Sequence, residues 1–233
     1  MRIGRGLYAM FLAGVFALAT GALPVVTAAP RDGAAPSITE QVLYSFCSQS
    51  NCADGANPFA YGGLIMDTSG NLYGTTSVGG NATGGGTVFQ LTPSDTGWSE
   101  TVLYSFCSQT RCADGLYPYG DLIMDEAGNL YGTTWRGGSG TQLISGVAFE
   151  LTPDSTGTAW TETVLYNFCS QSNCADGGGP FAGLLMDASG NLYGTTNVGG
   201  NFNNKCAVQG CGTVFALNLG TTLTASNRAA ARP

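Results

Sequence analysis

The residues with the clearest capacity for chemistry are the eight cysteines, which form four pairs with four residues inside each pair. The first three pairs recur in one motif that runs from Phe-Cys to Cys-Ala-Asp-Gly. In an exported chain this spacing lets a short loop fold back and close as a disulfide. The predicted disulfides are Cys47–Cys52, Cys107–Cys112, Cys169–Cys174 and Cys206–Cys211.

Two other cysteine chemistries compete with disulfide formation. Structural zinc sites accept cysteines about two to four residues apart, so thiolate metal binding fits the spacing, but an oxidising compartment argues against it. Redox catalysis is disfavoured because the chain lacks a Cys-x-x-Cys motif. The sequence also contains no histidine, which excludes Ser-His-Asp and Cys-His catalysis and imidazole metal sites. We therefore predict no catalytic residue, no metal site and no cofactor.

Aromatic residues supply the candidate ligand contacts. Trp135 and Arg136 stand where matching segments have Ser-Val and Asn-Val, and a tryptophan there could stack on a sugar ring or another hydrophobic ligand. Packing of the indole on neighbouring loops is the alternative. Other aromatic candidates follow the Asp-Gly turns, where they could line a channel mouth or pack between repeats. These residues are Phe59, Tyr61, Tyr117, Tyr119 and Phe181.

Two sets of aspartates recur at fixed positions. Asp67, Asp125 and Asp187 open predicted hairpin turns, where a bond from the side chain to the turn backbone is favoured over calcium binding or acid–base catalysis. A second set precedes glycine and is interpreted in the same way, as turn residues. This set is Asp54, Asp114 and Asp176.

These candidates lie on a repeating framework. The motif Glu-x-Val-Leu-Tyr-x-Phe-Cys begins at Glu40, Glu100 and Glu162, with offsets of 60 and 62 residues. Each copy continues through a Gly-Asn-Leu-Tyr-Gly-Thr-Thr segment and a Gly-Gly pair to a short apolar strand. A fixed period of this length indicates a tandem array of one supersecondary unit.

Each unit contains four predicted strands, which in the first copy are residues 63–67, 71–76, 87–91 and 101–106. The chain has 36 glycines among 233 residues, in keeping with many turns between short strands. We therefore predict an all-β fold, a β-propeller-like array of three four-stranded antiparallel blades.

The ends of this array are incomplete. Residues 41–46 form a fourth-type strand with no blade before it, and residues 213–217 form a third-type strand with no fourth strand after it. Pairing of these two segments would complete the third blade and cover two exposed edges. It would either close a three-bladed monomer or join two chains in a six-bladed homodimer.

The phrases Met66-Asp-Thr-Ser-Gly-Asn-Leu-Tyr-Gly-Thr-Thr76 and Gly86-Thr-Val-Phe-Gln-Leu91 resemble the GloVer-type tandem repeat of bacterial extracellular "choice-of-anchor" proteins. The Asp-x-x-Gly-Asn-Leu-Tyr core also resembles blades of NHL-like β-propellers. The GloVer resemblance covers residues 40–219 and implies a secreted or surface repeat protein with no known reaction. The short polar tail carries no sorting motif or apolar anchor that would support surface attachment.

The N-terminal residues indicate export. Arg2 and Arg5 precede an apolar run over residues 7–26, and Val-Thr-Ala ending at Ala28 resembles a signal-peptidase site. A retained membrane anchor is the alternative, but two glycines and a proline interrupt the run. Cleavage removes two of eight basic residues, so the net charge of −7 becomes −9. This charge disfavours nucleic acid and anionic membranes as partners.

The predicted organisation is a signal peptide (1–28), a linker (29–39), a three-repeat domain (40–219) and a disordered tail (220–233). The repeats span about 40–99, 100–161 and 162–219. We predict a secreted, periplasmic or extracellular protein with no membrane span after cleavage.

The predicted function is a non-catalytic binding or scaffold role, with a polysaccharide or an extracellular protein as partner. A carboxylate-dependent hydrolase or lyase acting on polysaccharide is the alternative. Such an enzyme needs two carboxyl groups about 5–9.5 Å apart in a cleft. Asp121, Glu126 and Glu150 each occur in one copy only, as a catalytic pair would, but nothing in the sequence groups them.

Overall fold

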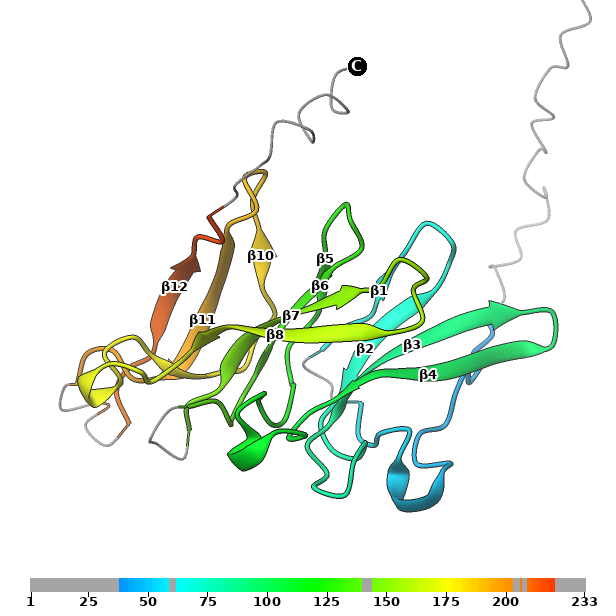
Figure 1. Ribbon diagram of the computed structural model, residues 1–233, viewed down its shortest axis with the longest axis horizontal. Coiled ribbons are helices and arrows are strands. Elements are labelled where there is room, and N and C mark those ends of the chain that lie inside the picture. Colours follow the sequence, from blue (N-terminus) through cyan, green and yellow to red (C-terminus); the bar gives the residue numbers. More distant parts are fainter. Residues whose placement is uncertain (1–37, 59–61, 140–143, 203–205, 207–208, 221–233) are drawn as a thin grey trace, which may run out of the picture. The chain divides into compact units, whose positions relative to one another are not determined.

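The computed structural model describes residues 38–58, 62–139, 144–202, 206 and 209–220 (Figure 1). The chain divides into two compact units, Met1–Glu40 and Gln41–Pro233, and of the first only residues 38–40 are described. The predicted signal peptide, nearly all of the linker, Phe59, Tyr61 and the tail beyond residue 220 lie outside the described residues.

The described part of this unit consists of antiparallel strands and three short 3-10 turns. The first sheet has the order β1-β2-β3-β4, and the second repeats it as β5-β6-β7-β8. The first repeat comprises η1 (Ser50–Cys52), β1 (Ile65–Met66), β2 (Leu72–Thr76), β3 (Thr87–Ser94) and β4 (Gly97–Ser105). The second comprises η2 (Thr110–Cys112), β5 (Ile123–Met124), β6 (Leu130–Thr134), β7 (Val147–Pro153) and β8 (Trp160–Asn167).

The third sheet differs in composition from the other two. It contains β9 (Gly178–Pro180), β10 (Leu185–Met186), β11 (Leu192–Val198) and β12 (Thr213–Leu217), after η3 (Ser172–Cys174). Both β9 and β10 pair with β11, and β12 pairs with β11 on its other side. Within the described residues no strand follows β12, so this sheet lacks a counterpart of β4 and β8.

The predicted all-β class with three antiparallel four-stranded sheets is confirmed, whereas the strand boundaries move. The first predicted strand of each repeat shrinks to two residues, in β1, β5 and β10, while β3 and β4 extend toward each other up to a hairpin in which Ser94 opposes Gly97. Pro93 lies beyond the predicted strand 87–91, in the extended part of β3, opposite Trp98 near the end of the ladder. A proline is tolerated there because few ladder hydrogen bonds remain to be lost.

The long strands β4 and β8 link consecutive sheets. Each pairs with the strand before it through a register shift, after Val88 in β3 and after Ala148 in β7, and such bulges bend and twist a strand. Beyond β4, Phe106 contacts Phe149 of the second sheet at 4.9 Å between ring centroids. Beyond β8, Phe168 contacts Phe215 of the third sheet at 4.8 Å. The hydrophobic cores therefore lie between successive sheets.

Residues 41–46 do not form the predicted strand with β12. They belong to no assigned strand, and Leu43, Tyr44 and Phe46 pack on the first sheet, where Phe46 lies 4.8 Å from Phe89. This contact repeats the packing of Phe106 and Phe168. The segment therefore occupies the position of a preceding β4-type strand, but without a sheet of its own.

Candidate functional site

The cystine loops and the described parts of the loops after β2, β6 and β11 lie on one side of the sheets (Figure 1). In each repeat the second glycine of the Gly-Gly pair donates its N–H to the carbonyl of the second cysteine of the loop, at 2.9 Å. These bonds are Gly80–Cys52, Gly138–Cys112 and Gly200–Cys174. We call this side of the molecule the cystine rim.

The four predicted disulfides are all present. In the first repeat the loop is built around Asp54, which is fully buried. Its carboxylate accepts hydrogen bonds from Tyr44 Oη and from the Ser48 N and Oγ, all at 2.8 Å, and from Gln49 N at 3.3 Å. Burial alone would raise the pKa of Asp54, but these bonds outweigh it and lower the pKa to about 2. The same network surrounds Asp114 and Asp176.

The structure brings five of the predicted ligand residues into one aromatic cluster. Tyr119 stacks on Phe181 at 4.8 Å between centroids, and Trp135 meets Phe181 edge-on at 5.6 Å. Tyr117 lies 6.2 Å from Tyr119 and 6.4 Å from Trp135. The guanidinium of Arg136 sits 4.1 Å from the centre of the Trp135 ring. All five side chains are partly exposed, so the cluster belongs neither to the core nor to open solvent.

Backbone pairing within the second repeat and a close approach between the second and third repeats position this cluster. Trp135 and Arg136 follow β6 and pair with the segment after η2, through Trp135 N to Tyr117 O at 2.9 Å and Leu116 N to Arg136 O at 2.8 Å. The second and third repeats then approach closely at Gly120. A methyl group there would lie 2.6 Å from the carbonyl oxygen of Ala182. This close approach places Tyr119 beside Phe181 of the next repeat.

Tyr117 has a backbone conformation that bulky residues rarely adopt, with φ of 61°. The matching positions hold Asn57 at φ 53° and Gly179 at φ 58°, two residue types that tolerate the left-handed region. The second repeat thus carries a strained aromatic residue where the others do not. Strain of this kind gathers at functional sites.

Two polar atoms of the cluster lack partners within the described part of the chain. Trp135 Nε1 and Arg136 Nε are buried and make no hydrogen bond there. Buried N–H groups are normally paired, because leaving one unpaired costs about 1–3 kcal/mol. Both atoms are covered by the protein itself, so they are not accessible to a ligand in this conformation.

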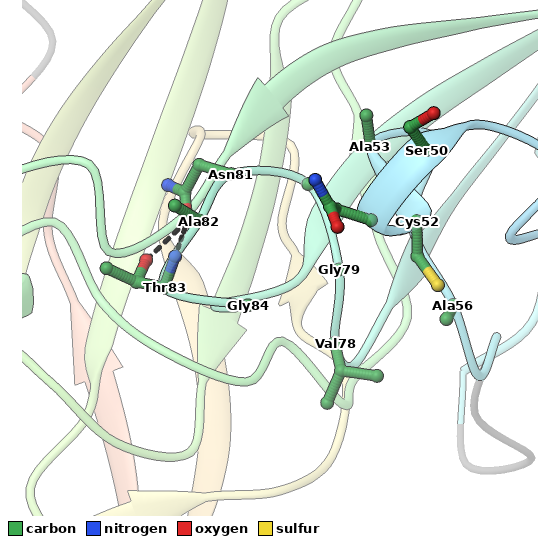
Figure 2. A pocket seen from close by; sticks show the side chains of 12 residues that line it. Ser50, Cys52, Ala53, Ala56, Val78, Gly79, Asn81, Ala82, Thr83 and Gly84 are labelled. Atoms are coloured by element: carbon green, nitrogen blue, oxygen red, sulfur yellow. Dashed lines mark hydrogen bonds between the residues drawn. The ribbon is translucent and has the colours of Figure 1, made fainter.

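A second feature of the cystine rim is an open groove in the first repeat, about 610 Å³ in volume. Figure 2 shows it between η1 and the loop that carries Val78 and Asn81. Small side chains and backbone line it, with no aromatic ring. Asn81, the first residue of an Asn-Ala-Thr glycosylation sequon, donates its side-chain N–H to Phe106 O at 2.8 Å and accepts from Thr83. A glycan on Asn81 would disturb this bond.

The recurring hairpin aspartates make the predicted turn bonds. Asp67 Oδ1 accepts from Ser69 N at 2.8 Å and Asn71 N at 2.9 Å, and its other oxygen accepts from Tyr73 Oη. Asp125 and Asp187 repeat this pattern. Their carboxylates are therefore engaged by the turn itself.

The acids found in one copy only have separate partners. Asp121 accepts from Gly63 N of the first repeat, and Glu150 accepts from Tyr131 Oη at 2.9 Å. Glu126 lies exposed in the β5–β6 turn. No group of three Asp, Glu, Cys or His residues suited to a metal occurs within the described ranges.

Sequence reasoning missed one recurring feature, the partly buried glutamates Glu100 and Glu162, each with one carboxylate oxygen fully covered. Burial, reinforced by the charge of Asp54 beside Glu100 and of Asp114 beside Glu162, raises the pKa of each glutamate to about 7. A protonated carboxyl beside an ionised one is a pattern found in acid–base sites. Here the pair recurs in two repeats and the aspartates are fully buried and hydrogen-bonded, which favours a structural role. The recurrence of Glu in the repeat motif was the available signal.

The chain was also compared with known proteins. The profile of the Gloeobacter/Verrucomicrobia repeat matches residues 31–208. No curated protein matches the chain. Across the stretches that the structure describes, none of the helices is long and apolar enough to cross a membrane.

Proposed function

We propose that this chain, which belongs to the Gloeobacter/Verrucomicrobia repeat family, is an exported, non-catalytic binding protein that recognises a neutral polysaccharide through the aromatic cluster of its cystine rim. The observation that carries the proposal is the gathering of Tyr117, Tyr119, Trp135 and Phe181 from two repeats into one partly exposed cluster. Four disulfides are compatible with an oxidising, extracellular location.

The chemistry of the cluster suits a sugar ring. Aromatic faces bind the apolar faces of pyranose rings, and the four aromatic side chains of the cluster are all partly exposed. The sequence is strongly acidic, with a net charge of −7, which disfavours polyanionic ligands. A neutral glycan offers apolar ring faces and carries no negative charge.

The strain at Tyr117 distinguishes binding from packing. If the tyrosine only packed, the less strained asparagine of the first repeat would serve as well. Tyr117→Asn is therefore expected to raise the melting temperature, because it relieves a backbone cost of about 0.5–1 kcal/mol, and to weaken glycan binding. A substitution that stabilises the fold and weakens ligand binding indicates that the original residue is retained for function.

The first experiment is a screen of the mature protein on an array of neutral and acidic glycans, followed by calorimetric titration of any neutral glycan that binds. Trp135→Ser, which restores the residue of the first repeat, is expected to weaken binding by roughly 1–3 kcal/mol. Phe202→Ser, at an exposed aromatic residue of the loop after β11, is the matched control and should leave the affinity unchanged.

Unaltered affinity in a folded Trp135→Ser protein would rule out the aromatic cluster as the binding site. The non-catalytic part of the proposal has its own test, because a bound polysaccharide should show no new reducing ends or unsaturated products after prolonged incubation. Product formation that Glu150→Gln abolishes would favour a carboxylate-dependent enzyme instead.

A further inference from the structure

The two ends of the array expose apolar surfaces that are buried at every equivalent position inside it. Val214 of β12 is 83% exposed, whereas its counterparts Val88 and Ala148 are each 0% exposed beneath the next sheet. At the other end Leu64 is 54% exposed, whereas its counterparts Leu122 and Leu184 are 1% and 7% exposed against the preceding sheet. Each end thus shows one half of the interface that joins successive sheets.

The two exposed halves are complementary. Inside the array, the face that carries Val88 and Tyr73 packs on the face that carries Leu122 and Phe149. The third sheet presents the first kind of face through Val214 and Tyr193, and both are exposed. The first sheet presents the second kind through Leu64 and Met66, beside an apolar groove of about 430 Å³ lined also by Val42 and Phe89. Two faces of opposite kind fit a head-to-tail contact.

The backbone edges at the two ends of the array are also complementary. No described strand pairs with the outer edge of β12, although β3 and β7, its counterparts, pair with β4 and β8 there. Residues 41–46 have nearly the sequence of those strands, yet they pair with no strand. The recurring pairs Gln90–Thr101 and Glu150–Thr163 place Ala216 opposite Gln41 if this segment joins β12.

We propose that the open face of the third sheet and the edge of β12 bind residues 41–46 and the first sheet of a second copy of this chain. The contact is head-to-tail, and two copies make it twice, closing a ring of six sheets. Six lies within the range of about four to eight blades found in closed propellers. The pairing also removes a long exposed β-edge from each chain, which otherwise favours aggregation.

The first test is light scattering of the mature protein at micromolar concentration, where we expect the mass of a dimer. Val214→Asp is expected to give a monomer. Its melting temperature should equal that of the wild-type monomer, because the side chain of Val214 is exposed in the single chain. Leu64→Asp, on the opposite face, should also give a monomer. Phe202→Asp, an exposed apolar residue in the loop after β11, is the matched control and should remain dimeric.

Mixing the two charged variants tests the head-to-tail arrangement. Val214→Asp protein keeps an intact first sheet and Leu64→Asp protein keeps an intact third sheet, so one of the two contacts can form between them. An equimolar mixture should therefore recover dimer, while each variant alone stays monomeric. A wild-type monomer, species larger than a dimer, or dimers of either charged variant alone would each overturn the proposal.

A cross-link tests the register without depending on the charged variants. The double variant Gln41→Cys with Ala216→Cys should form a covalent dimer on a non-reducing gel, while Gln41→Cys alone should not. Both positions are exposed in the single chain. A cross-link confined to one chain would show that the segment closes its own third sheet, and no cross-link would contradict the register; either result overturns the proposal.

Discussion

Each of the three cystine loops that follow a Phe-Cys dipeptide holds non-glycine residues at positive φ. In the first and third loops the residue before the second cysteine is Asn51 or Asn173, at φ 57° and 55°, and asparagine tolerates this conformation well. The second loop has Arg111 at φ 59° instead. The same backbone is therefore built at unequal cost in the three repeats.

Arg111→Asn is expected to stabilise the protein by about 0.5–1 kcal/mol, since it relieves this backbone cost without altering the disulfide. Chemical denaturation of the oxidised protein measures the effect. Asn51→Arg, the reverse change in the first loop, should destabilise by a similar amount. If both variants had the stability of the wild type, the backbone of the loop would not discriminate between asparagine and arginine.

The partly buried glutamates Glu100 and Glu162 predict a pH dependence of stability. Glu100 and Glu162 have pKa values raised from the usual 4.5 to about 7, so the folded state holds their protons more tightly than the unfolded state does. This contribution to stability is full below pH 4.5 and declines as the pH rises toward 7. The double variant Glu100→Gln with Glu162→Gln should therefore lose less stability between pH 5 and pH 8 than the wild type.

Melting temperatures at pH 5 and pH 8 measure this difference. Glu126→Gln, at an exposed turn position, serves as the control and should follow the wild type. A double variant with the same pH dependence as the wild type would contradict the burial of these carboxyl groups.

At the scale of elements, β4 has two roles that its sequence pattern did not separate. Its backbone pairs with β3 of the first sheet, while Leu103 and Tyr104 near its end and Phe106 just beyond pack against the core of the second sheet. The strand therefore couples two sheets, so that loss of its packing affects both. A nearest-neighbour array of this kind depends on such shared interfaces for its cooperativity.

Phe106→Ala is expected to destabilise the protein by about 3–5 kcal/mol, because this fully buried ring contacts Phe149 across the interface. Phe46→Ala removes an equivalent contact with Phe89, but Phe46 is partly exposed and its segment pairs with no strand, so the loss should be smaller. Denaturation of both variants, each compared with wild type as monomers at low protein concentration, measures the contrast. Equal losses would contradict the coupling role of β4.

At the scale of the whole molecule, the disulfides stabilise loops and do not join sheets. Every bridge connects cysteines five positions apart in the chain. Closing so short a loop is worth about 2 kcal/mol on the chain-entropy account. The contacts between sheets are made by apolar side chains instead.

Reduction should therefore lower the melting temperature while leaving the strand signal in far-ultraviolet circular dichroism at room temperature. The buried Asp54 network would hold the first loop near its place after reduction. Loss of the strand signal on reduction at room temperature would show that the bridges, rather than the cores between sheets, maintain the fold.

The spacing of residues along the chain determined many local features of this structure. The repeat period, the pairing of cysteines and the hairpin turns at Asp67 and its counterparts all follow from residues close in the chain. These features are readable because each involves contacts within one short segment, whose geometry the sequence spacing limits.

Contacts between repeats were decided by tertiary structure. The sequence marked Tyr119, Trp135 and Phe181 as aromatic residues near turns, but only the close approach at Gly120 places Tyr119 and Phe181 together. In the same way, residues 41–46 were expected to pair with β12, and in the folded chain they pack on the first sheet. The physical reason is that such contacts depend on the twist of each sheet and on its stacking against the next, and strand patterns along the chain carry no direct signal of either.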